Sequence, residues 1–207
     1  DFEGDRVDMI DPIIAANSGE TLGTILDGFS IRQSPTDFWS NPVIDIENSS
    51  ITIQNCDLSG FEWNDVKDGT SSGLLMRFIN SNSHLKNVSI NDIAYESSNS
   101  AIGHGLIYVE GNDPTLPGNP TFENMVIQNC KIVGNSNQIF DFKGGVFYIQ
   151  AAVVDFMHTK FHNNILDLND NVAYGGAIYI DSGDVIFANC EFKGNGSRSN
   201  NQDAKGG

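Results

Sequence analysis

One short motif recurs along this chain and constrains its fold more than any other feature. A glycine or proline followed by alternating apolar residues occurs five times, in runs that start at Pro42, Gly73, Gly105, Gly145 and Gly176. The starts lie 31, 32, 40 and 31 residues apart. Self-similarity at such a period is typical of solenoids, in which each repeat forms one coil. The 40-residue interval contains a loop insertion at residues 111–120, which has three prolines and two glycines.

A second motif lies between the first ones, and it predicts further strands. Residues 53–58, 127–132 and 187–192 each carry Asn-Cys between apolar residues, and residues 156–161 have the same spacing. Short segments of alternating hydrophobicity, separated by Asn, Gly and Ser, indicate β-strands joined by tight turns. The sequence therefore predicts an all-β parallel β-solenoid over residues 21–207, with about six coils of about 31 residues. Helical spacing in residues 7–16 predicts a short helical cap within a lead-in segment, residues 1–20.

Two glycine and asparagine motifs resemble a known repeat family. The pair Gly175-Gly176-Ala177-Ile178 and Phe192-Lys193-Gly194-Asn195 is similar to the GGA[ILV] and FxxN signatures of chlamydial polymorphic outer-membrane protein repeats, and Phe161-His162-Asn163-Asn164 is a second FxxN. The resemblance implies a right-handed parallel β-helix of the pectin-lyase-like class. Repeats of this kind also occur in large secreted and surface proteins of protists. Such a signature is evidence for fold rather than for chemistry.

The charge balance excludes two classes of partner. The formal net charge is −16, and the 11 Lys and Arg residues form no basic stripe. Binding to nucleic acid depends on neutralising phosphates with basic residues, so the sequence predicts no nucleic-acid partner, and an anionic membrane surface is disfavoured for the same reason. No apolar run approaches the ~20 residues that a membrane-spanning helix needs. We therefore expect no membrane-spanning segment.

The three cysteines are predicted to be reduced. Cys56, Cys130 and Cys190 occupy the same place in the second motif, which predicts one inward-facing structural position. Two coils would separate each from the next by about 10 Å, beyond the ~7 Å Cα separation that a disulfide allows. We expect them to pack as small apolar side chains.

Alternation along the glycine-led strand separates a core ladder from an outer face. One parity is apolar in every copy and predicts the core: Ile44 and Ile46, Ile107 and Val109, Phe147 and Ile149, Ile178 and Ile180. The other parity gives an outward column of Asp45, Met76, Tyr108, Tyr148 and Tyr179, beside a mostly acidic column of Glu47, Glu110, Gln150 and Asp181. One interpretation is that stacked tyrosines only stabilise the strand surface. The other is an exposed tyrosine-acid binding face for sugar rings, Ca²⁺ or a partner protein.

The candidate catalytic and metal motifs are incomplete. Gly103-His104-Gly105 resembles the G-H-G element of polygalacturonases, but the other elements of that family are missing, and His104 is interpreted as occupying the first-glycine position of the repeat. His158 and His162 should both face outward on a strand, which argues against a metal pair. Residues 167–171 have the spacing of the start of a calcium loop, but Val172 replaces the required glycine. The sequence predicts no catalytic set, metal site or cofactor, and leaves Ca²⁺ as a candidate ligand.

Three N-glycosylation sequons begin at Asn48, Asn87 and Asn195. The repeat also calls for another strand where the sequence stops, at Gly207, so we expect a segment of a longer solenoid or an end that another chain covers. These features favour a non-catalytic extracellular or cell-surface module: a stalk, filament component or adhesion module whose partners are other copies or chains of a larger assembly. The alternative is a polysaccharide-active enzyme with Glu110, Asp181 or Asp45 as acid or base, or a carbohydrate-binding module.

Overall fold

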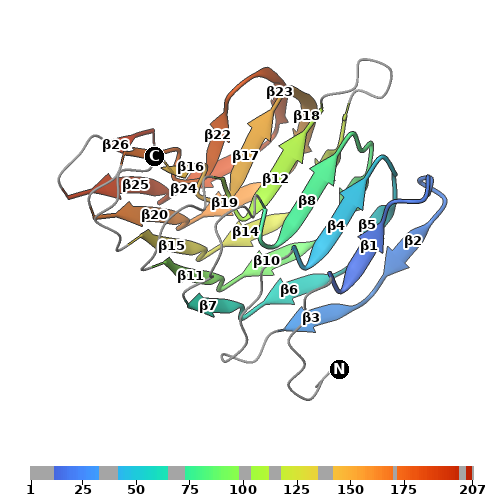
Figure 1. Cartoon of the computed structure of the whole chain (residues 1–207), viewed down its shortest axis with the longest axis horizontal. Coiled ribbons are helices and arrows are strands. Elements are labelled where there is room, and N and C mark those ends of the chain that lie inside the picture. The colour runs from blue at the N-terminus through green and yellow to red at the C-terminus, as the bar shows by residue number, and fades with distance from the viewer. Residues whose placement is uncertain are drawn as a thin grey trace.

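The chain folds into a parallel β-solenoid. A computed structural model describes residues 12–32, 42–64, 73–97, 104–111, 118–134, 142–169, 172–200 and 204–206. These residues contain 26 short strands and no helix. Every strand pair is parallel, and each strand pairs with its counterpart one coil earlier or later (Figure 1). The predicted fold class, an all-β parallel solenoid, is therefore confirmed.

Five sheets run along the solenoid, one strand from each coil. The first sheet contains β1 (Ile14–Ala16), β4 (Ile44–Glu47), β8 (Met76–Ile79), β12 (Ile107–Glu110), β17 (Phe147–Gln150) and β22 (Ile178–Ile180). The second contains β2 (Ile25–Asp27), β5 (Thr52–Gln54), β9 (His84–Lys86), β13 (Thr121–Glu123), β18 (Ala152–Met157) and β23 (Gly183–Ala188). Because the first sheet holds six strands, the chain makes five full circuits from β1 to β22.

The other three sheets complete each coil. The third contains β3 (Ser30–Arg32), β6 (Asp57–Ser59), β10 (Ser89–Asn91), β14 (Val126–Gln128), β19 (Lys160–His162) and β24 (Glu191–Lys193). The fourth contains β7 (Glu62–Asn64), β11 (Ala94–Ser97), β15 (Lys131–Gly134), β20 (Ile165–Leu168) and β25 (Gly196–Ser199). The fifth, just before the first sheet in each circuit, contains β16 (Phe142–Lys143), β21 (Ala173–Tyr174) and β26 (Ala204–Lys205).

The core consists of side-chain columns that run along the solenoid axis. In-register parallel pairing places equivalent residues about 4.8 Å apart, so like side chains stack on like. Phe122, Phe156 and Phe187 form one such column, with ring centroids 5.0 and 5.2 Å apart. Phe161 and Phe192 form another, at 4.7 Å and nearly parallel. Most of the predicted core ladder is fully buried, and Ile178 and Ile180 of the last coil are less so.

The corners between sheets depend on residues with left-handed backbone angles. Between the second and third sheets, equivalent positions are held by Asn55, Asn87, Asn124, His158 and Asn189, all with φ near +54°. Asparagine tolerates this conformation better than most residues. Its side chain also bonds along the row: Asn87 Nδ2 donates to Asn55 Oδ1 at 2.9 Å, and Asn124 Nδ2 donates to Asn87 Oδ1 at 3.3 Å. Asn55, Asn87 and Asn124 thus form an asparagine ladder along the solenoid.

The prediction of a helical cap at the N-terminus is wrong for residues 14–16, the part of it that forms a described strand. Ile14–Ala16 is strand β1, which pairs in register with β4, and not the end of a helix. Residues 7–11 of the expected helical cap lie outside the described residues. Helical spacing over so few residues also fits a short strand, and pairing with β4 satisfies the backbone groups of this segment.

The three cysteines do not share one structural position, contrary to the prediction. Cys56 and Cys190 lie at the corner between the second and third sheets, whereas Cys130 lies at the next corner, between the third and fourth. Both corners need an inward apolar residue, a left-handed residue and then a small inward side chain, so their local sequences look alike. All three thiols are free, with Cys56 and Cys130 buried. Burial raises the pKa of Cys130 to about 12, so this thiol is unreactive.

The strand β8 is in a different register from the one that the sequence suggested. Gly73 has φ +72°, like Gly144 and Gly175, and is therefore equivalent to the first glycine of the pair rather than the second. Met76 consequently pairs with Ile107 and faces inward, while Arg77 pairs with Tyr108 and faces outward. A left-handed glycine and a strand-leading glycine are indistinguishable in the sequence when only one is present.

Candidate functional site

The strongest candidate site is the outer face of the first sheet. Its first outward column runs in register through Asp45, Arg77, Tyr108, Tyr148 and Tyr179. The second column, two residues further along each strand, contains Glu47, Ile79, Glu110, Gln150 and then Asp181. The structure therefore brings together all six predicted binding-face residues and adds Arg77, which takes the place expected for Met76. We call these two columns the tyrosine-acid face.

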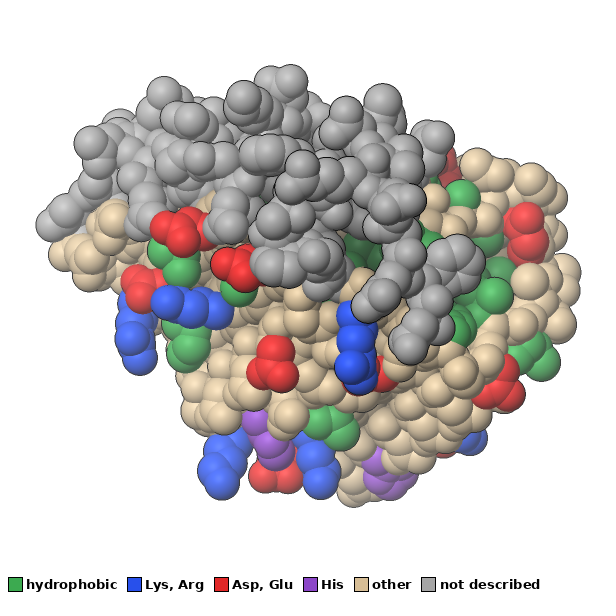
Figure 2. Space-filling view, turned by 90° about the horizontal axis from the view of Figure 1, so that it is seen from below, with side chains coloured by type: hydrophobic (Ala, Val, Ile, Leu, Met, Phe, Trp, Pro, Cys, Tyr) green, Lys and Arg blue, Asp and Glu red, His purple; other side chains and the backbone are tan. Residues whose placement is uncertain are grey.

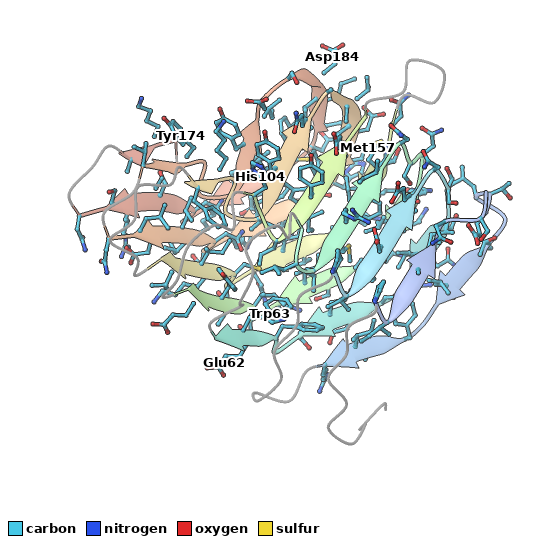
Figure 3. The ribbon with its side chains drawn as sticks, in the orientation of Figure 1. Glu62, Trp63, His104, Met157, Tyr174 and Asp184 are labelled. Carbon is cyan, nitrogen blue, oxygen red and sulfur yellow. The ribbon has the colours of Figure 1, made fainter. Side chains whose placement is uncertain are left out.

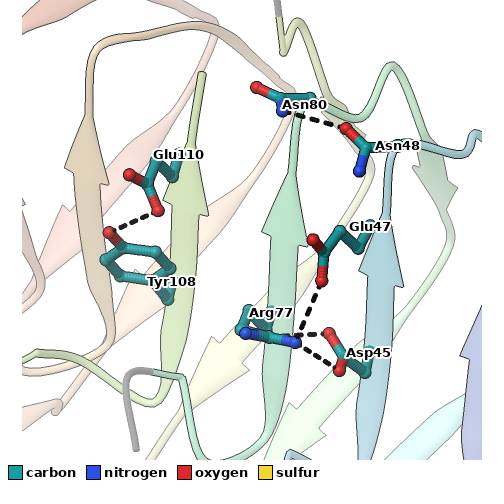
Figure 4. Close-up of polar contacts among 7 residues, drawn as sticks. All are labelled: Asp45, Glu47, Asn48, Arg77, Asn80, Tyr108 and Glu110. Atoms are coloured by element: carbon teal, nitrogen blue, oxygen red, sulfur yellow. Dashed lines mark hydrogen bonds and ion pairs between the residues drawn. The ribbon is translucent and has the colours of Figure 1, made fainter. Parts of the chain in front are cut away.

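Arg77 ties together the acidic end of this face (Figure 4). Its Nε and Nη2 atoms donate to the two carboxylate oxygens of Asp45 at 2.8 and 2.6 Å, and Nη2 also lies 3.4 Å from Glu47 Oε2. This is a bidentate arrangement, the strongest form of arginine-carboxylate pairing. The hydrogen bond to Asp45 raises the pKa of Arg77 above its usual value. Asp45 is thus paired with a permanent cation.

The three tyrosines form a continuous stack. Tyr108 and Tyr148 have ring centroids 5.6 Å apart and an interplanar angle of 8°, and Tyr148 and Tyr179 are 5.7 Å apart at 6°. Tyr108 is only 7% exposed and Tyr148 only 3%. The prediction that these rings form an exposed platform is therefore wrong for Tyr108 and Tyr148, because both rings are buried. Tyr148 stacks on Tyr108 and Tyr179. A sugar ring that needs a free aromatic face has none available on Tyr148.

The tyrosine hydroxyls are bound to the neighbouring polar column. Tyr108 Oη donates to Glu110 Oε2 at 2.8 Å and lies 3.2 Å from Gln150 Oε1. Burial, followed by the charge of Asp181, raises the pKa of Tyr148 to about 12. Burial and the bond to Glu110 likewise raise the pKa of Tyr108. Both phenols therefore stay neutral, and they act as hydrogen-bond donors to carboxylates rather than as nucleophiles.

A row of residues that the sequence analysis did not assign to the site covers the stack from the side. His104 pairs with Lys143 in an isolated bridge, and Lys143 and Lys205 flank Tyr174 in the fifth sheet. His104 stacks on Tyr148 with ring centroids 4.1 Å apart. His104 and Tyr174 lie beside the first sheet in Figure 3. His104, Lys143 and Tyr174 each come directly before the glycine or glycine pair that leads a strand, and Lys205 comes directly before Gly206. This shared place in the repeat is the sequence signal that places them together.

Two lysines complete this row through cation-π contacts. Lys143 Nζ lies 5.4 Å from the ring centroid of Tyr179 and 3.8 Å from a carboxylate oxygen of Asp181. Lys205 Nζ lies 5.5 Å from the ring of Tyr174. The interpretation of His104 as occupying the first-glycine position is wrong, because its bridge to Lys143 places it one residue earlier. Its role in the structure is aromatic packing.

The carboxylates of the face are all engaged by neighbouring side chains. Asp45 and Glu47 interact with Arg77, Glu110 accepts a hydrogen bond from Tyr108, and Asp181 lies near Lys143. Glycoside hydrolysis needs one carboxyl group free to protonate the leaving group and a second free to act as base or nucleophile. The four carboxylates of the tyrosine-acid face are therefore not free to act as such a pair in the described arrangement.

The other predicted candidates are dispersed. His158 is exposed at a corner, and His162 lies on the third sheet 3.3 Å from a carboxylate oxygen of Glu191. In the described residues, no group of three or more His, Cys, Asp or Glu side chains is placed to hold a metal ion. Of the proposed calcium loop, residues 170 and 171 lie outside the described residues. Figure 2 shows charged side chains of both signs spread over one face among uncharged ones, with several acidic and basic side chains next to one another.

The asparagines of the three sequons differ in exposure. Asn48 and Asn87 are exposed at corners, whereas Asn195 is only partly exposed. Asn195 Nδ2 donates to the carbonyl oxygen of Phe161 at 2.8 Å. The loop insertion is described only at Gly111 and residues 118–120, so its tip lies outside the described residues.

Comparison with known proteins yields no relative: neither a protein-family model, a curated protein nor a solved structure matches this chain. Among the described residues, there is no helix of the length and hydrophobicity needed to span a membrane. The function of this chain is therefore inferred from the geometry of the solenoid.

Proposed function

We propose that this chain is a non-catalytic β-solenoid of an extracellular or cell-surface assembly, where it acts as a stalk, filament component or adhesion module. In this proposal it is a right-handed β-helix of the pectin-lyase-like class, as its repeat signature suggests. Its partners are other copies or chains, which it contacts laterally or end to end. The engaged carboxylates of the tyrosine-acid face favour this role over a polysaccharide-active one.

The observation that carries the proposal is the surface of the last coil. Ile180, Phe187 and Phe192 are 41%, 41% and 49% exposed, although their counterparts one coil earlier are fully buried. The strands β22–β24 also present backbone groups on the side that faces away from β17–β19. An apolar sheet edge of this kind favours pairing with a further strand. Such a surface is suited to receive another coil of the same fold, whichever chain supplies it.

The first test is electron-microscope imaging of the intact parent protein, isolated from its native source without refolding. Rods or filaments with a regular axial repeat are the expected result, because stacked coils make a stiff linear unit. Compact single particles that cleave an acidic polysaccharide, with or without Ca²⁺, would overturn the proposal in favour of the enzyme alternative.

The second test asks whether the last coil makes contacts. Sedimentation velocity over a concentration series should show association of the 207-residue chain, and Phe192→Asp should abolish it by placing a charge in the apolar contact. Val126→Asp is the matched control, because it adds the same charge on the third sheet, where the neighbouring residue in β19 is Lys160. Equal association of the wild type and the Phe192→Asp variant would contradict an end-to-end role.

A further inference from the structure

The amide of Asn195 is built into the interior of the solenoid. Its Oδ1 accepts hydrogen bonds from the backbone nitrogen and from Nδ2 of Asn164, at 3.0 and 2.9 Å, while its own Nδ2 donates to the carbonyl of Phe161. Asn164 is fully buried and repeats the pattern one coil earlier: its Nδ2 donates to the carbonyl of Ile127 and its Oδ1 accepts from the backbone nitrogen of Cys130. A sugar attached to Asn195 Nδ2 would have to occupy this interior row.

The amide of Asn87 is exposed but lies in the middle of an asparagine ladder. Its Nδ2 points toward Asn55, to which it donates at 2.9 Å, and its Oδ1 accepts from Asn124 on the other side. Neighbouring coils are only about 4.8 Å apart. A glycan on Asn87 would therefore displace Asn55 and break the ladder.

The amide of Asn48 has a different orientation. Asn48 is exposed at the corner between β4 and β5, and its Oδ1 accepts a hydrogen bond from Asn80 Nδ2 at 3.0 Å. Within the described residues, its Nδ2 donates no hydrogen bond that would be lost, and it points away from Asn80 (Figure 4). The backbone angle φ of +50° holds the residue at the outside of the corner.

We infer that Asn48 is the sequon on which this fold can carry an N-linked glycan, and that Asn195 must remain unmodified for the last coil to form. The transfer forms a bond between Asn48 Nδ2 and the anomeric carbon of an oligosaccharide. It breaks the bond between that carbon and the pyrophosphate of a lipid-linked donor, and it releases the lipid pyrophosphate and one amide proton. The occurrence of the glycan in the native source rests on the proposed extracellular location, whereas the choice among the three sequons rests on geometry alone.

The test is to express the 207-residue chain through the secretory route of a eukaryotic cell and map its glycans. Enzymatic glycan removal in heavy-oxygen water converts each glycosylated asparagine into a labelled aspartate, which peptide mass spectrometry locates. We expect label at Asn48 and none at Asn87 or Asn195. Ser50→Ala should remove the glycan, whereas Ser89→Ala and Ser197→Ala, which destroy the other two sequons, should leave it in place.

Two results would overturn the inference: an unlabelled Asn48, or a labelled Asn195 in the folded protein. The folded protein is defined as the protease-resistant fraction of both medium and cell lysate, so the result does not depend on efficient secretion. We expect label at Asn195 only in the protease-sensitive fraction, because a chain that is glycosylated there cannot form its last coil. Because the host is chosen for its glycosylation, this experiment can fail while the assembly proposed above is observed, and the reverse also holds.

Discussion

The guanidinium of Arg77 lies between two carboxylates of neighbouring side chains, Asp45 and Glu47, and forms ion pairs with both. Asp45 is mostly buried, with 19% of its side chain exposed, so its charge is costly without a partner. We expect Arg77→Gln to lower the free energy of unfolding by about 1–2 kcal/mol, as measured by urea denaturation. Lys86→Gln is the control, because Lys86 forms a more exposed ion pair with Glu123, and its loss should cost less than about 0.5 kcal/mol. Equal losses in both variants would contradict the importance of the Asp45 pair.

The ring of Tyr148 is held between two other tyrosines and His104, so it belongs to the packing of the molecule. Tyr148→Ser should lower the free energy of unfolding by about 2–4 kcal/mol, because it leaves a void in the stack. Tyr148→Phe keeps the ring contacts and should cost less than about 1 kcal/mol. Both values are measurable by thermal or urea unfolding. A serine variant as stable as the wild type would show instead that the stack contributes nothing to folding.

The corners between strands contain one residue that is poorly suited to its backbone conformation. Ala151 has φ +52° at a position equivalent to Asn48 and Asn80. Glycine adopts this angle without steric cost, so Ala151→Gly should raise the free energy of unfolding by about 0.5–1 kcal/mol. The same change at Ala94, an exposed residue of β11, should lower it by a similar amount. Changes of the same sign at both positions would contradict this account of the corners.

The strands could be predicted from the sequence because alternation and turn residues determine them locally. The parity of Ile107, Phe147 and their equivalents was read correctly, since one face of the strand is always apolar. The corner that holds Cys130 could not be distinguished from the one that holds Cys56, because both corners impose the same local pattern. Register across coils failed at Gly73 for a similar reason: the backbone angle that identifies its position is invisible in the sequence.

The side-chain environment of the candidate site was less predictable than the strands. Outward parity correctly placed the three tyrosines on one face, but parity does not determine exposure. His104 lies outside the named strands, in the coil of Tyr108, and contributes to the burial of Tyr148 by stacking on it from this neighbouring coil. Contacts of this kind depend on how the segment that precedes each strand of the first sheet lies against the next coil. The alternation of residues within a strand does not determine that placement.

At the scale of the whole molecule, each coil contacts only the coils beside it, so stability should vary along the axis. In such quasi-one-dimensional folds an inner coil has two stabilising interfaces and a terminal coil has one. The last coil also has open apolar columns, with Phe192 49% exposed against a fully buried Phe161. We therefore expect hydrogen exchange, followed by mass spectrometry, to be slowest for amides of β12 and β14 and faster by at least about tenfold for β22 and β24. Uniform protection along the chain would mean that all coils open together, and that the solenoid behaves as a single cooperative unit. If a second copy or another chain occupies the last coil, adding it should slow exchange in β22 and β24 while leaving β12 unchanged.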